Sequence, residues 1–136
     1  MSKAIPTLQK YMTTVPHTIG AEQTLEKAEK MMAEYRIRHL PVLQGGKLVG
    51  ILSDRDVRLV ESFRDVDPAS TTVEEAFTPD PYIVSPSSNL REVCDEMAAR
   101  KYGCVLVCDN HKLVGIFTWV VALKALGDLM DTRLKH

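Results

Sequence analysis

The sequence repeats itself with a constant shift of 65 residues and without a gap. Residues 15–60 overlie residues 80–125, and ten of these 46 aligned positions are identical. Five identities are consecutive, because Lys-Leu-Val-Gly-Ile occurs at 47–51 and again at 112–116. Chance similarity between two stretches of like patterning is the alternative, and the gapless register argues against it. The sequence therefore predicts two copies of one structural unit.

Each copy predicts the same order of elements: a short strand, a helix, a hairpin and a second helix. Thr24 and Asn89 occupy equivalent positions and mark helix starts, because a short polar side chain there can accept a backbone N–H. Apolar residues at helical spacing follow and indicate core-facing stripes. These are Leu25, Ala28, Met31, Met32 and Tyr35 in the first copy, and Leu90, Val93, Met97 and Ala98 in the second.

Two strands joined by a two-residue turn follow the helix of each copy. Gly45-Gly46 and Asn110-His111 stand where a tight hairpin needs positive φ angles. Pro41 lies in the first strand of its hairpin and has no N–H for a ladder, so we expect this strand at an edge or with its N–H side free. The closing helices are expected at about 54–63 and 119–130.

One copy alone is too small to cover both faces of its strands. We therefore expect an α/β (α+β) fold of two βαββα repeats, related by a pseudo-twofold axis and packed sheet to sheet. The expected boundaries are 8–63 and 73–130. Residues 64–72, rich in Asp, Pro and Ser, read as a surface linker.

Composition excludes several classes of function. Seventeen Lys and Arg balance eighteen Asp and Glu, and this net charge of −1 argues against a broad nucleic-acid surface. No apolar run approaches the ~20 residues that span a bilayer, and the start of the chain lacks a secretory signal. Three cysteines make a poor disulfide framework. We expect a cytoplasmic protein that binds neither nucleic acid nor membrane.

Metal and catalytic sites are not indicated. Cys104 and Cys108 lie four apart on an expected strand, and no second pair accompanies them, so buried thiols are the better interpretation. The histidines have no ligand spacing. Asp54 and Asp56 have no partner spaced for acid–base or nucleophilic work, and we therefore expect no enzyme activity.

Several motifs resemble one known family. They are Lys10-Tyr11-Met12-Thr13, Arg38-His39-Leu40-Pro41-Val42, the run from Leu48 to Asp56, and Leu113-Val114-Gly115-Ile116-Phe117-Thr118. In this order, and twice, they resemble a tandem pair of cystathionine β-synthase (CBS) domains, also called a Bateman module. The resemblance extends from about residue 8 to residue 130.

The resemblance implies an adenosine-containing ligand, such as AMP, ADP, ATP, S-adenosylmethionine or an NAD-type molecule, in clefts between the copies. The family motif is Gly, a hydroxyl residue three positions later, and Asp three beyond that. Gly50, Ser53 and Asp56 match it. A carboxylate at Asp56 can accept from both ribose hydroxyls, while Ser53 and the helix N-terminus can serve a phosphate. The alternative is that Ser53 and Asp56 only form a capping box.

The second copy departs from the motif, because Val121 stands where Asp56 does and cannot bind a ribose hydroxyl. The resemblance therefore implies one good cleft and one poor cleft. The better cleft would use Ser53, Arg55 and Asp56 with Ile83, Val84, Gly103, Cys104 and Val105. The weaker cleft would use Thr18, Ile19, Arg38, His39, Pro41 and Thr118.

The resemblance also implies a homodimer. The two closing helices supply apolar residues for such an interface: Val57, Leu59, Val60 and Phe63 in one, and Val120, Val121, Leu123, Ala125 and Leu126 in the other. The expected function is a non-catalytic sensor that regulates a partner protein which the sequence does not identify. The alternative is a dimerisation scaffold that binds no ligand.

Overall fold

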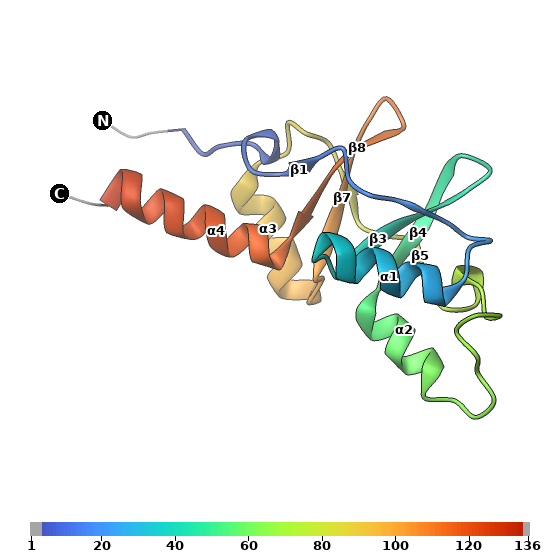
Figure 1. Cartoon of the computed structure of the whole chain (residues 1–136). Coiled ribbons are helices and arrows are strands. Elements are labelled where there is room, and N and C mark those ends of the chain that lie inside the picture. Colours follow the sequence, from blue (N-terminus) through green and yellow to red (C-terminus); the bar gives the residue numbers. More distant parts are fainter. Residues whose placement is uncertain (1–3, 135–136) are drawn as a thin grey trace. The chain divides into compact units, whose positions relative to one another are not determined.

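The computed structural model describes residues 4–134, which form two compact units, each with its own four-stranded sheet (Figure 1). The first-repeat unit comprises residues 16–81, and the second-repeat unit comprises residues 82–134 together with residues 4–15. Each unit is a sheet with helices, which confirms the predicted α+β class and the two repeats.

The same elements recur in both units. The first-repeat unit contains β2 (Ile19–Gly20), α1 (Leu25–Tyr35), β3 (His39–Gln44), β4 (Lys47–Ser53), α2 (Asp54–Glu61), the 3-10 helix η2 (Val73–Glu75) and β5 (Thr78–Pro79). The second-repeat unit contains the 3-10 helix η1 (Leu8–Lys10), β1 (Thr13–Thr14), β6 (Ile83–Val84), α3 (Leu90–Arg100), β7 (Cys104–Asp109), β8 (Lys112–Thr118), α4 (Trp119–Leu129) and the π-helical turn η3 (Met130–Leu134).

The strand registers of the two sheets are also the same. Strand β2 pairs in parallel with β3, aligning Ile19 with Val42, and β6 pairs in parallel with β7, aligning Val84 with Val107. The hairpins β3–β4 and β7–β8 are antiparallel, and each has one irregularity, directly after Val42 and directly after Val107. Both pairs of positions differ by the 65-residue shift of the sequence, so the repeat holds at the level of single residue pairs.

The fourth strand of each sheet comes from the segment that precedes the other repeat. Strand β5 pairs with β4, and β1 pairs with β8, both antiparallel and over two residues. Gly50 makes the first pairing possible, because a Cβ there would overlap the carbonyl oxygen of Thr78 and the ring of Phe77. At Gly115 a Cβ would lie 2.8 Å from the Met12 sulfur and 3.0 Å from the Thr13 carbonyl oxygen. A close approach of backbone thus requires glycine at position 50, and the approach at Gly115 is similar but less tight.

Each unit has its own apolar core beneath its first helix. Leu25, Ala28 and Met32 of α1 are buried in one core, and their counterparts Leu90, Val93 and Met97 of α3 are buried in the other. The predicted stripes are confirmed at these positions. Tyr35, predicted as part of the first stripe, is instead 41% exposed, and its ring stacks on His17 with 3.6 Å between centroids.

Caps and turns follow the sequence prediction. The side chain of Thr24 accepts the N–H of Lys27, and that of Asn89 accepts the N–H of Glu92, each at 3.1 Å. Gly45, Gly46, Asn110 and His111 all have positive φ angles, between 51° and 81°. These turn geometries match the strand twist of a tight hairpin.

The sequence left two possibilities for Pro41: an edge strand is wrong, whereas a strand with a free N–H side agrees with the observed pairing. Strand β3 lies between β2 and β4. Pro41 is tolerated because β2 pairs only with the two residues that follow it. In the second repeat the equivalent Leu106 donates its N–H to the carbonyl of Tyr82 at 2.9 Å, a bond that proline cannot make.

Helices α1 and α2 bring two carboxyl groups together. Glu61 is the last residue of α2, and its Oε2 atom is buried without a hydrogen-bond donor among the described residues. A hydrogen bond with Glu61, burial, and the negative charges of Glu61 and Glu26 raise the pKa of Glu29 on α1 to about 7. The pair is satisfied when Glu29 carries a proton, because the protonated carboxyl group supplies the missing donor.

We expect Gly50→Ala to lower the free energy of unfolding by about 1–3 kcal/mol, because the new methyl group must push β5 away from β4. Urea denaturation measures this loss. Gly127→Ala is the matched control, since a Cβ at this helical position meets nothing within 4 Å. It should be neutral or stabilising by about 0.5–1 kcal/mol. Equal effects of the two substitutions would contradict the close approach at Gly50.

The Glu29–Glu61 pair predicts a pH dependence of stability. A carboxyl group whose pKa is raised by folding contributes stability that is complete below about pH 4.5 and is lost as the pH rises toward 7. Glu61→Gln should therefore raise the midpoint of thermal unfolding more at pH 8 than at pH 5. Glu34→Gln on α1 is the control and should show no such difference. An equal gain at both pH values would rule out the pair as the cause.

Candidate functional site

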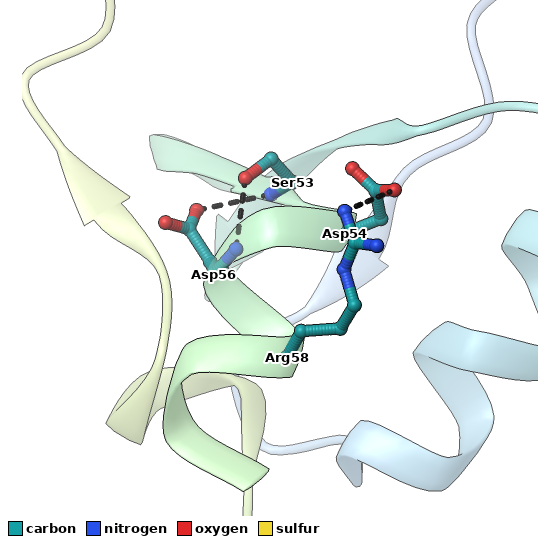
Figure 2. A network of polar contacts seen from close by, with 4 residues as sticks. All are labelled: Ser53, Asp54, Asp56 and Arg58. Carbon is teal, nitrogen blue, oxygen red and sulfur yellow. Dashed lines mark hydrogen bonds and ion pairs between the residues drawn. The ribbon is translucent and has the colours of Figure 1, made fainter. Parts of the chain in front are cut away.

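The end of β4 and the start of α2 together hold the complete family motif. Strand β4 ends at Ser53, and α2 begins at the next residue. The Ser53 hydroxyl oxygen accepts the N–H of Asp56 at 3.0 Å, and Oδ2 of Asp56 accepts the N–H of Ser53 at 3.0 Å (Figure 2). The capping box that the sequence offered as an alternative is therefore present. Its two side chains are half-buried, so they still face a surface that a ligand can reach.

The other charged groups of this turn point elsewhere. Asp54 pairs with Arg58 at 3.3 Å on a different side of the helix from Asp56 (Figure 2). The N–H of Asp54 donates to the carbonyl of Arg38 at 3.0 Å. Arg55 is exposed. Within this turn, Asp56 is the carboxylate that the fold holds beside Ser53.

Thr78 is a neighbour of Asp56 that the sequence motif does not include. Its hydroxyl group lies 3.2 Å from Oδ2 and 3.3 Å from Oδ1 of Asp56. Thr78 belongs to β5, which follows α2 by a long loop. The signal that could have found it is the identity of Thr13 and Thr78 in the repeat alignment, which marks the position without showing its contact.

His39 lies beside the same motif. It is the register partner of Ser53 across the β3–β4 pair. Burial lowers the pKa of His39, the carboxylates of Asp54 and Asp56 oppose this, and Arg38 adds to it. The imidazole is therefore neutral at pH 7, and it offers a ring N–H or a lone pair rather than a positive charge.

The second repeat builds the same helix start without the carboxylate. The Thr118 side chain accepts the N–H of Val121 at 3.3 Å, as Ser53 does for Asp56. Val121 is half-buried and packs against the core of its unit. Cys104 is the register partner of Thr118, and Trp119 donates its N–H to the carbonyl of Gly103 at 3.1 Å. Backbone geometry is thus the same in the two repeats, while the carboxylate is present only in the first.

The predicted site residues differ in how far their side chains are exposed to solvent. Ile83 is 48% exposed, and Val84 is half-buried. The side chains of Val105 and Ile19 belong to the cores of their own units, so these positions can offer a ligand only backbone groups. Thr18 is half-buried and Arg38 is exposed. The combination of first-repeat and second-repeat residues into two clefts stays a prediction.

Cys94, Cys104 and Cys108 are free, and burial raises the pKa of all three thiols, that of Cys104 to about 12. Such thiols are protonated and poor nucleophiles at pH 7. Within residues 4–134, no three His, Cys, Asp or Glu side chains are grouped to hold a metal ion. The helices described there are too short or too polar to cross a membrane.

Comparison with known proteins places this geometry in a family. The model of the CBS domain matches residues 8–61 and 73–128. The chain belongs to the CBS-domain family. It is a tandem CBS pair, as the repeat and its motifs predicted.

Two relatives match most of this chain. The CBS domain-containing protein YhcV of Bacillus subtilis is 30% identical over 125 residues, which cover 92% of this chain and 84% of that protein. Inosine-5'-monophosphate dehydrogenase of Korarchaeum cryptofilum is 32% identical over 119 residues, which cover 87% of this chain. The match spans only 24% of the dehydrogenase.

Two solved structures share the fold over nearly the full chain. A putative acetoin utilization protein (AcuB) from Vibrio cholerae has a TM-score of 0.86 at 28% identity, covering 98% of both chains. CBSX2 of Arabidopsis thaliana in complex with AMP has a TM-score of 0.76 at 25% identity, covering 90% of this chain and 97% of that one. The CBSX2 structure shows that a CBS pair of this size can hold an adenine nucleotide.

Proposed function

We propose that this CBS pair is a non-catalytic regulatory module that binds an adenosine-containing ligand, with the Asp56 carboxylate as the ribose anchor. The observation that supports this proposal is the half-buried carboxylate of Asp56, which hydrogen bonds hold beside Ser53 at the start of α2. AMP, ADP, ATP, S-adenosylmethionine and NAD-like molecules all contain the ribose that this anchor would bind. The AMP complex of CBSX2 supports an adenine nucleotide within this class.

The hydrogen bonds of the site determine which groups remain for a ligand. The N–H groups of Asp54 and Asp56 already have acceptors in Arg38 and Ser53. The Ser53 hydroxyl accepts one bond and keeps its own proton to donate. A phosphate would therefore be bound by this hydroxyl and by the exposed Arg55 guanidinium, helped by the positive end of the α2 dipole. Asp56 would remain free to serve the ribose.

The two repeats are expected to differ in affinity. Val121 removes the carboxylate from the second helix start, where Thr118 keeps only its capping role. A ribose placed there would find no acceptor pair. We therefore propose one good site, at Ser53 and Asp56, and one poor site, at Thr118. The predicted walls of the better site are Ile83, Val84, Gly103, Cys104 and Val105.

Calorimetry with AMP, ATP and S-adenosylmethionine tests the proposed site. Asp56→Asn should weaken binding about tenfold or more, because an amide replaces a charged acceptor whose hydrogen bonds contribute about 1.5–3 kcal/mol. Asp54→Asn is the control: it removes the same charge from the same helical turn, on the side that pairs with Arg58. It should leave the affinity within about twofold, the range expected of a screened surface charge.

Two outcomes would count against the sensor. The first is an absence of binding by all three compounds at millimolar concentration. The second is an equal effect of the two asparagine variants. Thermal unfolding of both variants separates lost binding from lost structure, since Asp56→Asn also weakens the capping box.

The second candidate function is a dimerisation scaffold, which is favoured by exposed apolar residues on the closing helices. Leu59 on α2 and Phe63 just beyond it are 59% and 58% exposed. Helix α4 carries four more such residues in its own unit: Trp119, Val120, Leu123 and Leu126. Val57 and Ala125, which the sequence assigned to the same interface, are buried in the cores instead. Exposed apolar stripes of this size typically mark interaction surfaces.

We propose that α4 contributes to a homodimer interface. Leu123→Glu should shift the chain from dimer to monomer in sedimentation velocity, because it places a charge within the apolar stripe. Lys124→Glu puts the same residue at the next position, which is exposed and outside the stripe, and should leave the dimer intact. A monomeric parent chain would refute the homodimer. If both variants were monomeric, the introduced negative charge, and not its position in the apolar stripe, would be the cause of dissociation.

A further inference from the structure

The Asp56 carboxylate has a partner outside the helix start that carries it. The Thr78 hydroxyl lies within hydrogen-bond distance of both carboxylate oxygens, at 3.2 and 3.3 Å. Thr78 comes from β5, a strand of two residues, so a short segment of the chain reaches the ribose anchor of the proposed site. This contact is not needed to form α2, whose N-terminus is already capped by Ser53 and Asp56.

Gly50 explains why Thr78 lies so close. Thr78 is the register partner of Ile51, and Pro79 is the register partner of Gly50. A side chain at Gly50 would overlap the carbonyl oxygen of Thr78. The first residue of the Gly50, Ser53, Asp56 motif therefore admits the strand whose hydroxyl contacts the last residue of that motif.

The second repeat provides an internal comparison. Thr13 occupies the position of Thr78, pairs with Ile116 of β8, and lies against Gly115 in the same way. The residue equivalent to Asp56 is Val121, which has no acceptor for the Thr13 hydroxyl. Strand β1 nevertheless pairs with β8 in the same register that β5 adopts with β4. The hydroxyl–carboxylate bond is therefore not required for strand pairing.

We propose that Thr78 is a positioning residue that holds the Asp56 carboxylate in the orientation that accepts both ribose hydroxyls. An ionised carboxylate has about four acceptor positions. The Ser53 N–H takes one, and the single Thr78 proton takes another, which leaves two for the two hydroxyls of a ribose. The hydrogen bond also fixes the side-chain rotamer, so less conformational entropy is lost when the ligand binds. This inference rests on the proposed function, because it assigns Thr78 to the same site.

The first test compares Thr78→Val, Thr78→Ser and the matched control Thr13→Val, with AMP and 2'-deoxy-AMP as probes in calorimetry. Thr78→Val should weaken AMP binding about tenfold, the effect of one hydrogen bond to a charged group. Its effect on 2'-deoxy-AMP should be smaller, because that probe lacks one of the two hydroxyls. Thr78→Ser keeps the donor and should restore parental affinity for AMP. Thr13→Val should bind AMP like the parent chain.

The second test needs no ligand. If Thr78 holds the Asp56 carboxylate, its loss should also loosen the bond from the Ser53 N–H to that carboxylate. Amide hydrogen exchange at Ser53, measured by NMR, should then be faster in Thr78→Val than in the parent chain and unchanged in Thr13→Val. Thermal unfolding of each variant confirms that it is folded.

Three results would overturn the role of Thr78: unchanged AMP affinity in Thr78→Val, equal weakening for AMP and 2'-deoxy-AMP, or unchanged exchange at Ser53. A parent chain that binds no AMP has a different meaning. It would remove AMP as the ligand of the site, while the exchange at Ser53 would still decide whether Thr78 holds Asp56.

Discussion

In each sheet a two-residue strand, β5 or β1, lies close to a glycine of the neighbouring hairpin. The pairing of this fourth strand depends on that contact. At Gly50 the backbone of Thr78 occupies the space of a missing side chain, and at Gly115 the Met12 side chain and the Thr13 carbonyl oxygen approach closely. This allows β5 and β1 to become the fourth strands of sheets that β4 and β8 would otherwise end. The repeated Lys-Leu-Val-Gly-Ile block is conserved between the copies at this point because both copies make the same approach.

The start of α2 combines a structural role with the proposed binding role. A capping box satisfies two backbone N–H groups, and it uses the same two side chains that the family motif assigns to the ligand. The two roles are compatible, because hydroxyl and carboxylate groups have more hydrogen-bonding positions than the cap uses. Thr118 and Val121 show that the helix still begins at the same place when the carboxylate is absent.

The net charge of −1 does not show how charged side chains are arranged at individual sites. Asp54, Arg55 and Asp56 lie within a single turn of α2: Asp54 pairs with Arg58, Asp56 contacts Ser53 and Thr78, and Arg55 is exposed. At the opposite end of the same helix, Glu61 meets Glu29, and a hydrogen bond with Glu61 and burial raise the pKa of Glu29 to about 7. Net charge therefore does not describe the electrostatics of any one site.

The sequence by itself determined the repeat, the order of elements, the caps at Thr24 and Asn89, the hairpin turns and the motif at the start of α2. The caps, the turns and the motif depend on residues within a few positions of one another, and the repeat is found by comparing two stretches of the sequence directly, so no contact needs to be known. Only the tertiary structure decided that Pro41 lies in an interior strand, that Glu29 meets Glu61, and that Thr78 reaches Asp56. These contacts join segments that are distant in the chain. Their partners depend on how the strands are ordered, which no local pattern contains.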